Sequence, residues 1–400
     1  MKKLFALILA AAMALSLVAC GGTGSSAPAS AAGSQSAPVS ASQADAEGTA
    51  ASLPVPYPEK TVKIGVEIYD PTDVEVLAMQ AYFQALKDEG LNVDFIYSEA
   101  LASAEAELAF VDDCYNAGCQ GILGYYNISQ GEVVQKCVDY GMYYWGSAFD
   151  YEDVVEKFAD NPYCLDIINN GDGDYDGGYA LGEFFGKRGA KKVIYASGGA
   201  DFGVTMFVNR REGFKAAAEE YGIEYVEVSG FPGDAFFADQ NAALSEDVDG
   251  VAASFNGLDF WAQPIAAAGK TETCPLATIG TMNESYVGAM ESGSVSFLFS
   301  GNIQRFGLAV ALLVNAADGN AEVLQQDGRI GTYVSTRWIV DSAEKAKEYW
   351  EASQGTGIYN LADLESLMVN LNPDASSETL KALVEGGSLE DVAARRAAQA

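Results

Sequence analysis

Between residues 61 and 317, short apolar runs alternate with stretches of helical periodicity, and this alternation constrains the fold most strongly. A run such as Val62–Ile68 has the length and composition of a buried strand. The next stretch, Val74–Glu89, places apolar side chains on neighbouring helical turns and stops before a glycine. Strands that alternate with helices of this length form parallel sheets covered by helices on both faces. Because the rhythm occurs twice, we predict an α/β fold with two similar Rossmann-like lobes.

The individual elements follow from the same periodicity. The expected strands are 62–68, 93–97, 121–126, 142–147, 165–168, 192–197, 225–228, 250–255, 276–280 and 295–299. The expected helices are 74–89, 105–116, 132–140, 177–187, 204–221, 238–244, 259–268, 284–291 and 306–317.

Residues 341–400 have a different pattern from the two lobes. Four short amphipathic helices are expected, interrupted by Asn372-Pro373 and Gly386-Gly387. Their expected bounds are 343–352, 361–367, 377–385 and 389–397. This helical C-terminal extension serves as a docking appendage, or it packs against the lobes and frays at its end. The pattern leaves both alternatives open.

The first 20 residues have the order of a secretory signal. Two lysines precede the apolar run Leu4–Ala19, which is shorter than the ~20 residues of a membrane-spanning helix. The run leads into Leu-Val-Ala-Cys, which resembles a bacterial lipobox and implies that Cys20 is diacylated and becomes the mature N-terminus. Residues 21–56 consist mainly of Gly, Ser, Ala and Thr, so we predict a disordered linker. Residues 1–20 are thus a predicted lipoprotein signal peptide.

The composition excludes several classes of function. The chain has 56 acidic and 23 basic residues, a formal net charge of −33, and no histidine. The negative charge makes nucleic acid a poor partner. Without histidine there is no Ser-His-Asp or Cys-His catalysis and no His-containing zinc site. Because no nucleophile elbow or Gly-rich phosphate loop stands out either, we expect no enzymatic activity.

Five cysteines follow Cys20, and none of them has the CxxC spacing of a metal or redox motif. We expect small buried apolar residues, with one disulfide as an open alternative. They are Cys114, Cys119, Cys137, Cys164 and Cys274.

A series of short motifs follows in the order typical of one family. The motifs are Lys63-Ile64-Gly65-Val66, Gly121-Ile122-Leu123, Gly177-Gly178-x-x-x-Gly182, Arg210-x-x-Gly213-Phe214, Ser254-Phe255-Asn256 and Ile279-Gly280. Over about residues 61–339 the chain resembles the type I periplasmic binding proteins of the ribose/galactose-binding group. The resemblance implies two discontinuous lobes joined by a three-segment hinge, with the ligand beyond the carboxyl ends of the strands. The implied lobes are 57–165 plus 303–330 and 166–302 plus 331–340.

Ligand contacts are expected where the strands end and side chains reach the space between the lobes. Aromatic side chains there stack on a sugar or a base, and amide and guanidinium groups bind hydroxyls or carboxylates. We prefer Tyr126 to Tyr125 because neighbouring residues in a strand face opposite ways. The candidates are Tyr69, Asp70, Tyr126, Asn127 and Trp145 in the N-terminal lobe, and Phe202, Arg210, Asn256, Met282 and Asn283 in the C-terminal lobe.

Three candidates, Asn127, Arg210 and Asn256, match positions that contact sugar in the resembling proteins. Each of the last two also has a structural alternative: an ion pair for Arg210 and a helix N-cap for Asn256. The chain departs from the family at Met282, where the family has Asp, and at Ser147-Ala148, which replaces Asp-Arg. Loss of these charged groups makes a bulkier or less hydroxylated ligand, such as a nucleoside, an aryl glycoside or a cyclic polyol, an alternative to a simple sugar.

One acidic segment fits the spacing of an EF-hand calcium loop through Asp172, Asp174, Asp176 and Glu183. The same segment matches a family helix, and a helix would place Glu183 ~10 Å from Asp176 along its axis. Acidic residues at a helix N-terminus that interact with its dipole are the simpler explanation. We therefore predict no cofactor and keep calcium as the weaker alternative.

The resemblance implies the extracellular substrate-binding protein of an ABC importer. A sugar or sugar-like solute would be captured by hinge closure, and the closed form would be recognised by a membrane permease with its ATPase. We expect a monomer held by its lipid on the extracellular face of a Gram-positive cell membrane, or in the periplasm of a Gram-negative cell. The alternative is a nucleoside-binding or sensory surface lipoprotein of the same fold that signals to a membrane receptor.

Overall fold

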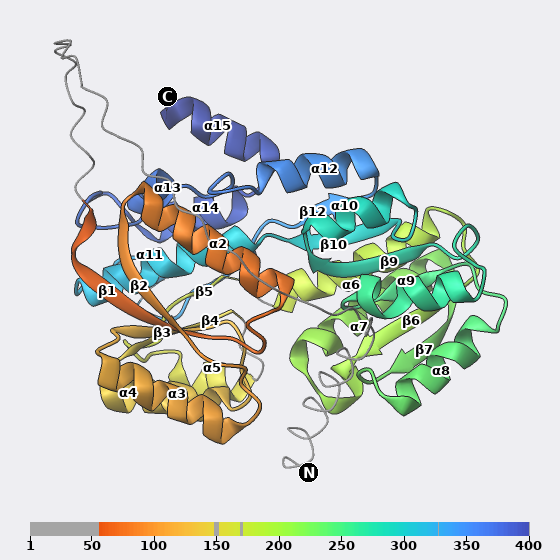
Figure 1. The fold of residues 1–400 in the computed structure, drawn as a ribbon, viewed down its shortest axis with the longest axis horizontal. Coiled ribbons are helices and arrows are strands. Elements are labelled where there is room, and N and C mark those ends of the chain that lie inside the picture. Colours follow the sequence, from red (N-terminus) through yellow and green to blue (C-terminus); the bar gives the residue numbers. More distant parts are fainter. Residues whose placement is uncertain (1–55, 148–151, 169–170, 327, 400) are drawn as a thin grey trace, which may run out of the picture.

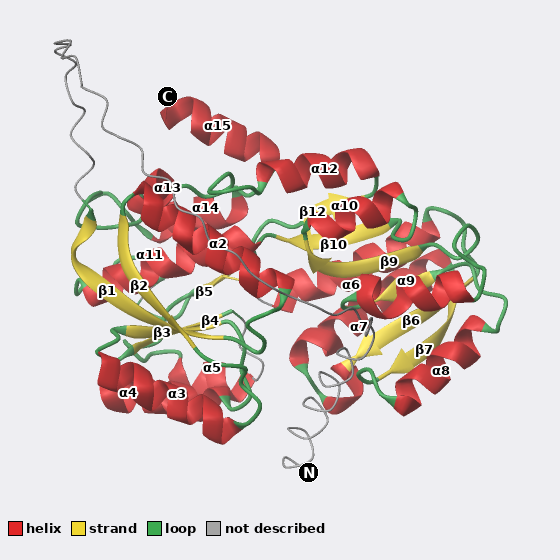
Figure 2. Cartoon of the chain, in the orientation of Figure 1, coloured by secondary structure: helices red, strands yellow, loops and turns green. Residues whose placement is uncertain are grey.

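The computed structural model describes residues 56–147, 152–168, 171–326 and 328–399. The predicted signal peptide, Cys20 and the linker up to residue 55 lie outside these residues. The described chain forms two α/β lobes side by side, each with helices on both faces of a mainly parallel sheet (Figures 1 and 2). This arrangement confirms the predicted fold class.

The N-terminal lobe is built on a parallel sheet with the strand order β2-β1-β3-β4. Ile64 in the central strand pairs with Phe95 on one side and with Gly121 on the other. Helices α2 and α11 cover one face and α3 and α4 the other (Figure 1). The elements are β1 (Tyr57–Glu67), α2 (Val74–Glu89), β2 (Leu91–Tyr97), α3 (Ala104–Ala117), β3 (Gly121–Gly124), α4 (Gln130–Tyr140), β4 (Tyr143–Gly146), α5 (Glu152–Phe158) and α11 (Phe306–Ala317).

The C-terminal lobe has a six-stranded sheet with the order β12-β10-β9-β8-β6-β7, in which only β12 is antiparallel. Alternate residues face the two layers: Tyr195 packs with the α6–α7 side, whereas Ile194 packs in the core that includes Trp261 of α9. The elements are α6 (Gly171–Gly186), β6 (Lys192–Gly198), η1 (Gly199–Phe202), α7 (Thr205–Tyr221), β7 (Glu224–Ser229), α8 (Asp234–Leu244), β8 (Val251–Ala253), α9 (Gly257–Ala267), β9 (Leu276–Thr281), α10 (Glu284–Glu291), β10 (Phe297–Gly301) and β12 (Trp338–Val340).

Glycines bring α6 and α7 into close contact. A Cβ atom added at Gly178 would lie 1.8 Å from the carbonyl oxygen of Arg210, and one at Gly213 would lie 2.0 Å from that of Tyr175. Gly182 faces Ala217 in the next contact along the helix pair. Small residues at four-residue spacing let two helix backbones approach, so the glycines in this segment serve helix packing.

Three chain segments connect the lobes. The first includes β5 (Ile167–Ile168), the second runs from β10 through η2 (Ile303–Arg305) into α11, and the third joins β11 (Thr332–Tyr333) to β12. β5 and β11 pair with each other in parallel. These three segments form the hinge of the described structure.

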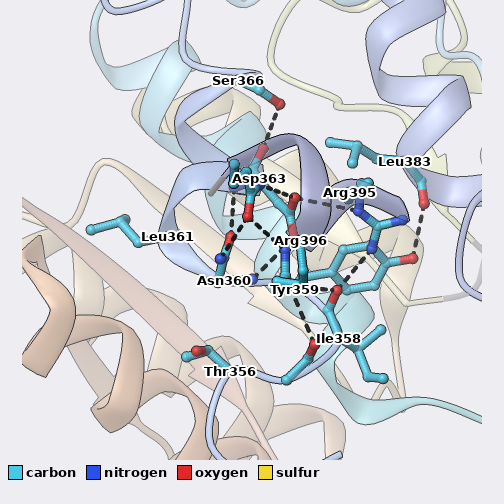
Figure 3. Close-up of polar contacts among 12 residues, drawn as sticks. Thr356, Ile358, Tyr359, Asn360, Leu361, Asp363, Ser366, Leu383, Arg395 and Arg396 are labelled. Atoms are coloured by element: carbon cyan, nitrogen blue, oxygen red, sulfur yellow. Dashed lines mark hydrogen bonds and ion pairs between the residues drawn. The ribbon is translucent and has the colours of Figure 1, made fainter. Parts of the chain in front are cut away.

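The C-terminal extension packs on both lobes. Helix α12 lies against α10 and β12 of the C-terminal lobe, whereas α13 lies against α11 of the N-terminal lobe. Within the extension, the buried carboxylate of Asp363 contacts Arg395 and Arg396 of the last helix (Figure 3). Of the two alternatives for this region, the structure shows packing against the lobes. The helices are α12 (Ala343–Ala352), α13 (Leu361–Glu365), α14 (Ser377–Glu385) and α15 (Leu389–Gln399).

All five cysteines of the described residues are buried and present as free thiols, so the expected burial is confirmed. No helix among the described residues is both long and apolar enough to cross a membrane.

Candidate ligand-binding site

Tyrosines gather where β1 and β3 of the N-terminal lobe end. The Tyr69 ring lies 6.2 Å from that of Tyr125 and 5.5 Å from that of Tyr126, measured between centroids. All three side chains are half-buried. Because β3 ends at Gly124, the alternation used to choose Tyr126 over Tyr125 does not apply beyond it, and both rings contact Tyr69.

Phenylalanines gather at the corresponding edge of the C-terminal lobe. Phe202 follows β6 and is 49% exposed, and its ring stacks on Phe231, which follows β7, with centroids 6.2 Å apart and planes at 9°. Phe207 joins this pair to Phe255, the second residue after β8, and Phe255 in turn contacts Phe260. We call these five residues the phenylalanine cluster. Sequence reasoning identified Phe202 alone, although Phe231 stands just after one expected strand and Phe255 ends another.

Arg210 is held within the C-terminal lobe. Its Nε and Nη2 donate to Oδ1 of Asp174 at 3.0 and 2.8 Å, and its Nη1 donates to the carbonyl oxygen of Ser254 at 2.7 Å. The two side chains are only 12% and 8% exposed. The structure therefore shows the ion pair that was the structural alternative for Arg210.

Asn256 stands at the N-cap position of α9 but does not cap it through its side chain. Its backbone is left-handed, with φ 38° and ψ 40°, and it is the one non-glycine residue with positive φ among the described positions. Such a conformation costs roughly 1 kcal/mol, and strain of this kind is concentrated at functional sites. Asn256 is exposed beside Phe255 of the phenylalanine cluster.

The other predicted contacts have local structural partners. Asp70 accepts hydrogen bonds from the Thr72 amide and hydroxyl, and Asn283 caps α10 by accepting from the Ser285 amide. Asn127 accepts from the Tyr144 hydroxyl at 2.7 Å. Trp145 and Met282 lie in the hydrophobic core, at 0% and 5% exposure. The Nε1 group of Trp145 finds no hydrogen-bond partner among the described residues.

Polar groups link the two lobes beside the tyrosines. Glu75 of α2 accepts a hydrogen bond from Tyr125 at 2.9 Å and is also hydrogen-bonded to Thr281 of β9. Burial, followed by the nearby charge of Asp73, raises the pKa of Glu75. Asp259 of the opposite lobe also lies near Asp73, and its pKa is raised by withdrawal from water and then by that charge. Carboxylates of both lobes thus lie close together beside the tyrosines.

The segment proposed as a calcium loop is part of helix α6. Asp174 pairs with Arg210, and Glu183 pairs with Lys187 at 2.8 Å one turn later. Asp176 is exposed on the same helix. No group of three potential metal-ligating side chains occurs in the part of the chain that the structure describes. The Asp172 side chain lies outside what the structure describes, and the helix separates Asp176 from Glu183 along its axis, as expected for the simpler explanation.

Solved structures of solute-binding proteins share this fold. An ABC transporter periplasmic solute binding protein from Actinobacillus succinogenes with bound D-allose matches with a TM-score of 0.59 and 15% identity, over 72% of this chain and 100% of that one. One from Bacillus halodurans with bound myo-inositol gives 0.56 and 18%, over 72% and 96%. A galactofuranose binding protein gives 0.56 and 13%, over 74% and 99%.

No protein-family model and no curated protein matches the sequence. At these identities the structural likenesses establish the fold, which is that of the type I periplasmic binding proteins. The neighbours are binding proteins by name, and each match leaves more than a quarter of this chain uncovered.

Proposed function

We propose that this protein is the extracytoplasmic substrate-binding component of an ABC importer and captures a small sugar-like solute between its lobes. The observation that carries the proposal is the pair of aromatic edges, Tyr69, Tyr125 and Tyr126 on one lobe and the phenylalanine cluster on the other. Aromatic faces at the carboxyl ends of parallel strands suit the C–H face of a sugar ring. The solved proteins of this fold with bound D-allose and myo-inositol support the same class of ligand.

Closure about the three-segment hinge would bring the two edges together on the solute. A ligand favours the closed form only through contacts that it makes better there, so residues of both lobes contribute. Tyr126 and Asn127 would act from the N-terminal lobe, and Phe202 and Asn256 from the C-terminal lobe. The division into lobes 57–165 plus 303–330 and 166–302 plus 331–340 belongs to this proposal.

A base-containing ligand is the second candidate. Five phenylalanine rings in contact offer a larger stacking surface than one sugar face needs, and a purine or pyrimidine ring would use it. Nucleosides therefore belong in the same ligand panel as sugars and polyols.

The test is a thermal-shift panel of sugars, polyols and nucleosides on the purified protein, followed by calorimetry on each compound that raises Tm. Phe202→Ala should weaken binding of such a compound about tenfold while leaving the unliganded Tm nearly unchanged. Phe237→Ala is the matched control, because Phe237 is 40% exposed on α8 of the same lobe and is not part of the cluster. Equal effects of the two variants would contradict the proposed site.

We also propose that Cys20 carries the lipid that anchors the protein outside the cell. Radiolabelled palmitate should label the wild-type protein in cells and not a Cys20→Ala variant. Labelling that persists in the variant would exclude this anchor.

A further inference from the structure

Two arginines stand together at the hinge. Arg305 ends η2, the segment that joins β10 to α11, and Arg337 immediately precedes β12 in the third hinge segment. A Cβ atom added at Gly301 would lie 2.8 Å from Nη1 of Arg337 and 3.2 Å from Nη1 of Arg305. The two Nη1 atoms are therefore within about 6 Å of each other. The absence of a side chain at Gly301 leaves room for both guanidinium groups.

Arg305 forms no ion pair in the described part of the chain, although the charges of Glu75 and Asp174 oppose the burial that lowers its pKa. Its Nη1 donates to the Asn302 carbonyl oxygen at 3.0 Å, its guanidinium lies 4.6 Å from the Phe306 ring centroid, and its buried Nε has no hydrogen-bond partner. In a chain with 56 acidic and 23 basic residues, an arginine without an ion pair is unexpected. A ligand group is the natural acceptor for that Nε–H.

The neighbouring guanidinium groups also favour an anion, against the opposing charges of Glu75 and Asp174. Burial, followed by the charge of Arg305, lowers the pKa of Arg337 to about 9, against the opposing effect of Asp174. Arg210 acts on Arg337 in the same direction as Arg305 and itself occupies Asp174. Two neighbouring guanidinium groups repel each other, and an anion bound by both relieves that repulsion.

This arginine pair adjoins the residues that link the lobes. Oγ1 of Thr281 lies 3.9 Å from the same Cβ position at Gly301, and Thr281 is hydrogen-bonded to Glu75 of the opposite lobe. We propose that Arg305 and Arg337 form an anion site at the hinge and that the solute carries a carboxylate or phosphate group which this site binds. The second half of this statement rests on the proposed function. Guanidinium forks bind either group with two hydrogen bonds, so sugar acids and sugar phosphates share the required chemistry.

The first arm of the test uses inorganic phosphate as the probe. Replacing chloride by phosphate at constant ionic strength should raise the Tm of the wild-type protein by about 2 °C. The increase should disappear in Arg305→Gln and in Arg337→Gln, and it should persist in Arg329→Gln, whose side chain is 61% exposed and pairs with Asp160. An increase that both hinge variants retain, or no increase in any variant, would overturn the anion site.

The second arm compares galactose with galacturonate and galactose 6-phosphate, and glucose with glucuronate and glucose 6-phosphate, by calorimetry. The acidic members should bind at least tenfold more tightly than the neutral ones, and Arg305→Gln should remove that difference. Whether the sugar acids or the sugar phosphates bind more tightly distinguishes a carboxylate ligand from a phosphate ligand. Tight binding of a neutral sugar that Arg305→Gln leaves unchanged would sink this inference and leave the proposed function standing. If the phosphate effect depended on Arg305 but no sugar-like compound bound, the anion site would stand and the proposed function would be contradicted.

Discussion

The lobes and the C-terminal extension share an apolar core, to which the extension adds a network of buried polar groups. The lobes pack apolar helix faces on apolar sheets, as in α11, where every residue from Phe306 to Ala316 is buried. The extension has short helices that bury Leu364, Leu367 and Leu380 in the same apolar core. Its contacts also include the buried polar side chains of Asp363 (Figure 3) and, in the adjoining hinge segment, of Gln304. Apolar packing tolerates small geometric changes, whereas a buried polar group loses stability steeply when one partner is removed. The extension should therefore be the more sensitive region to single polar substitutions.

Asp363→Ala should have the largest effect. The Asp363 side chain is 2% exposed, and its carboxylate accepts from Arg396 Nη1 at 2.9 Å, Gln399 Nε2 at 2.9 Å and the Asn360 amide at 3.2 Å. Arg395 Nε lies 3.3 Å from the same carboxylate. Removing this anion leaves two partly buried arginines uncompensated, so the free energy of unfolding should fall by about 3–5 kcal/mol in urea denaturation.

Asp374→Ala is the matched control for this variant, because Asp374 is exposed in the same extension. It should change the free energy of unfolding by less than about 0.5 kcal/mol. If Asp363→Ala behaved like Asp374→Ala, the extension would not contribute to cooperative folding and the contrast with the lobes would fail.

Gly178→Ala tests the packing of α6 against α7 within the C-terminal lobe. The added methyl group would overlap the backbone carbonyl of Arg210, at 1.8 Å, and α6 would have to move away from α7. We expect a loss of about 2–3 kcal/mol. Gly288→Ala, in helix α10 with no atom within 4 Å of the new Cβ, should instead stabilise the protein by about 0.5–1 kcal/mol because alanine favours the helix. If both variants changed the free energy of unfolding in the same direction, α6 could move away from α7 at little cost.

Gln304→Ala tests the hydrogen bonds between the second hinge segment and the C-terminal extension. The Gln304 side chain is fully buried, donates to the carbonyl oxygens of Ser353 and Gly355, and accepts from the amides of Ile358 and Tyr359. Losing these bonds should cost about 2 kcal/mol and speed hydrogen exchange at residues 353–359. Gln354→Ala, an exposed glutamine in the same turn, should leave both measurements unchanged. Unaltered exchange in Gln304→Ala would mean that other contacts hold this turn.

Local signals in the sequence predicted most of the fold. Helices α2, α10, α11 and α12 occupy the residues expected for them, because periodicity and capping residues act over a few positions. Helix α6 begins at Gly171 and not near Gly177, since the pairing of Asp174 with Arg210 and the contact with α7 outweigh the poor helix propensity of Gly and Asp. The short helix α5 was not expected at all.

The candidate site was harder to predict because it depends on contacts between distant parts of the chain. Strand ends indicated an edge of each sheet, and at these edges the structure brings Phe202 and Tyr126 into contact with other aromatic rings. They could not show that Trp145 and Met282 lie in the core, because Trp145 is a paired residue within β4 and Met282 follows β9, where alternation no longer fixes the side-chain direction. Arg305 and Arg337 were missed because 32 positions separate them in the sequence and only the hinge geometry brings them together.

The remaining expected effect depends on pH and concerns Asp166, a buried polar group of the hinge with an incomplete set of partners. Asp166 is 1% exposed; its Oδ1 accepts from the Gly331 amide at 2.6 Å, and its Oδ2 has no partner among the described residues. Burial raises the pKa of Asp166 to about 7, despite the opposing effect of that hydrogen bond. A carboxyl group with a raised folded-state pKa favours the folded protein below its unfolded pKa of about 3.9, and this advantage is lost as the pH rises towards 7.

Replacement by an amide that does not titrate removes this dependence. Relative to Asp166→Asn, the wild-type free energy of unfolding should therefore fall by about 2 kcal/mol between pH 5 and pH 8. Urea denaturation of both proteins across this range measures the difference, and Asp113→Asn, at an exposed position of α3, should follow the wild-type curve. Parallel curves for wild type and Asp166→Asn would mean that Asp166 stays ionised and solvated in the hinge. The buried polar groups of the hinge would then resemble those of the extension in having their charge compensated.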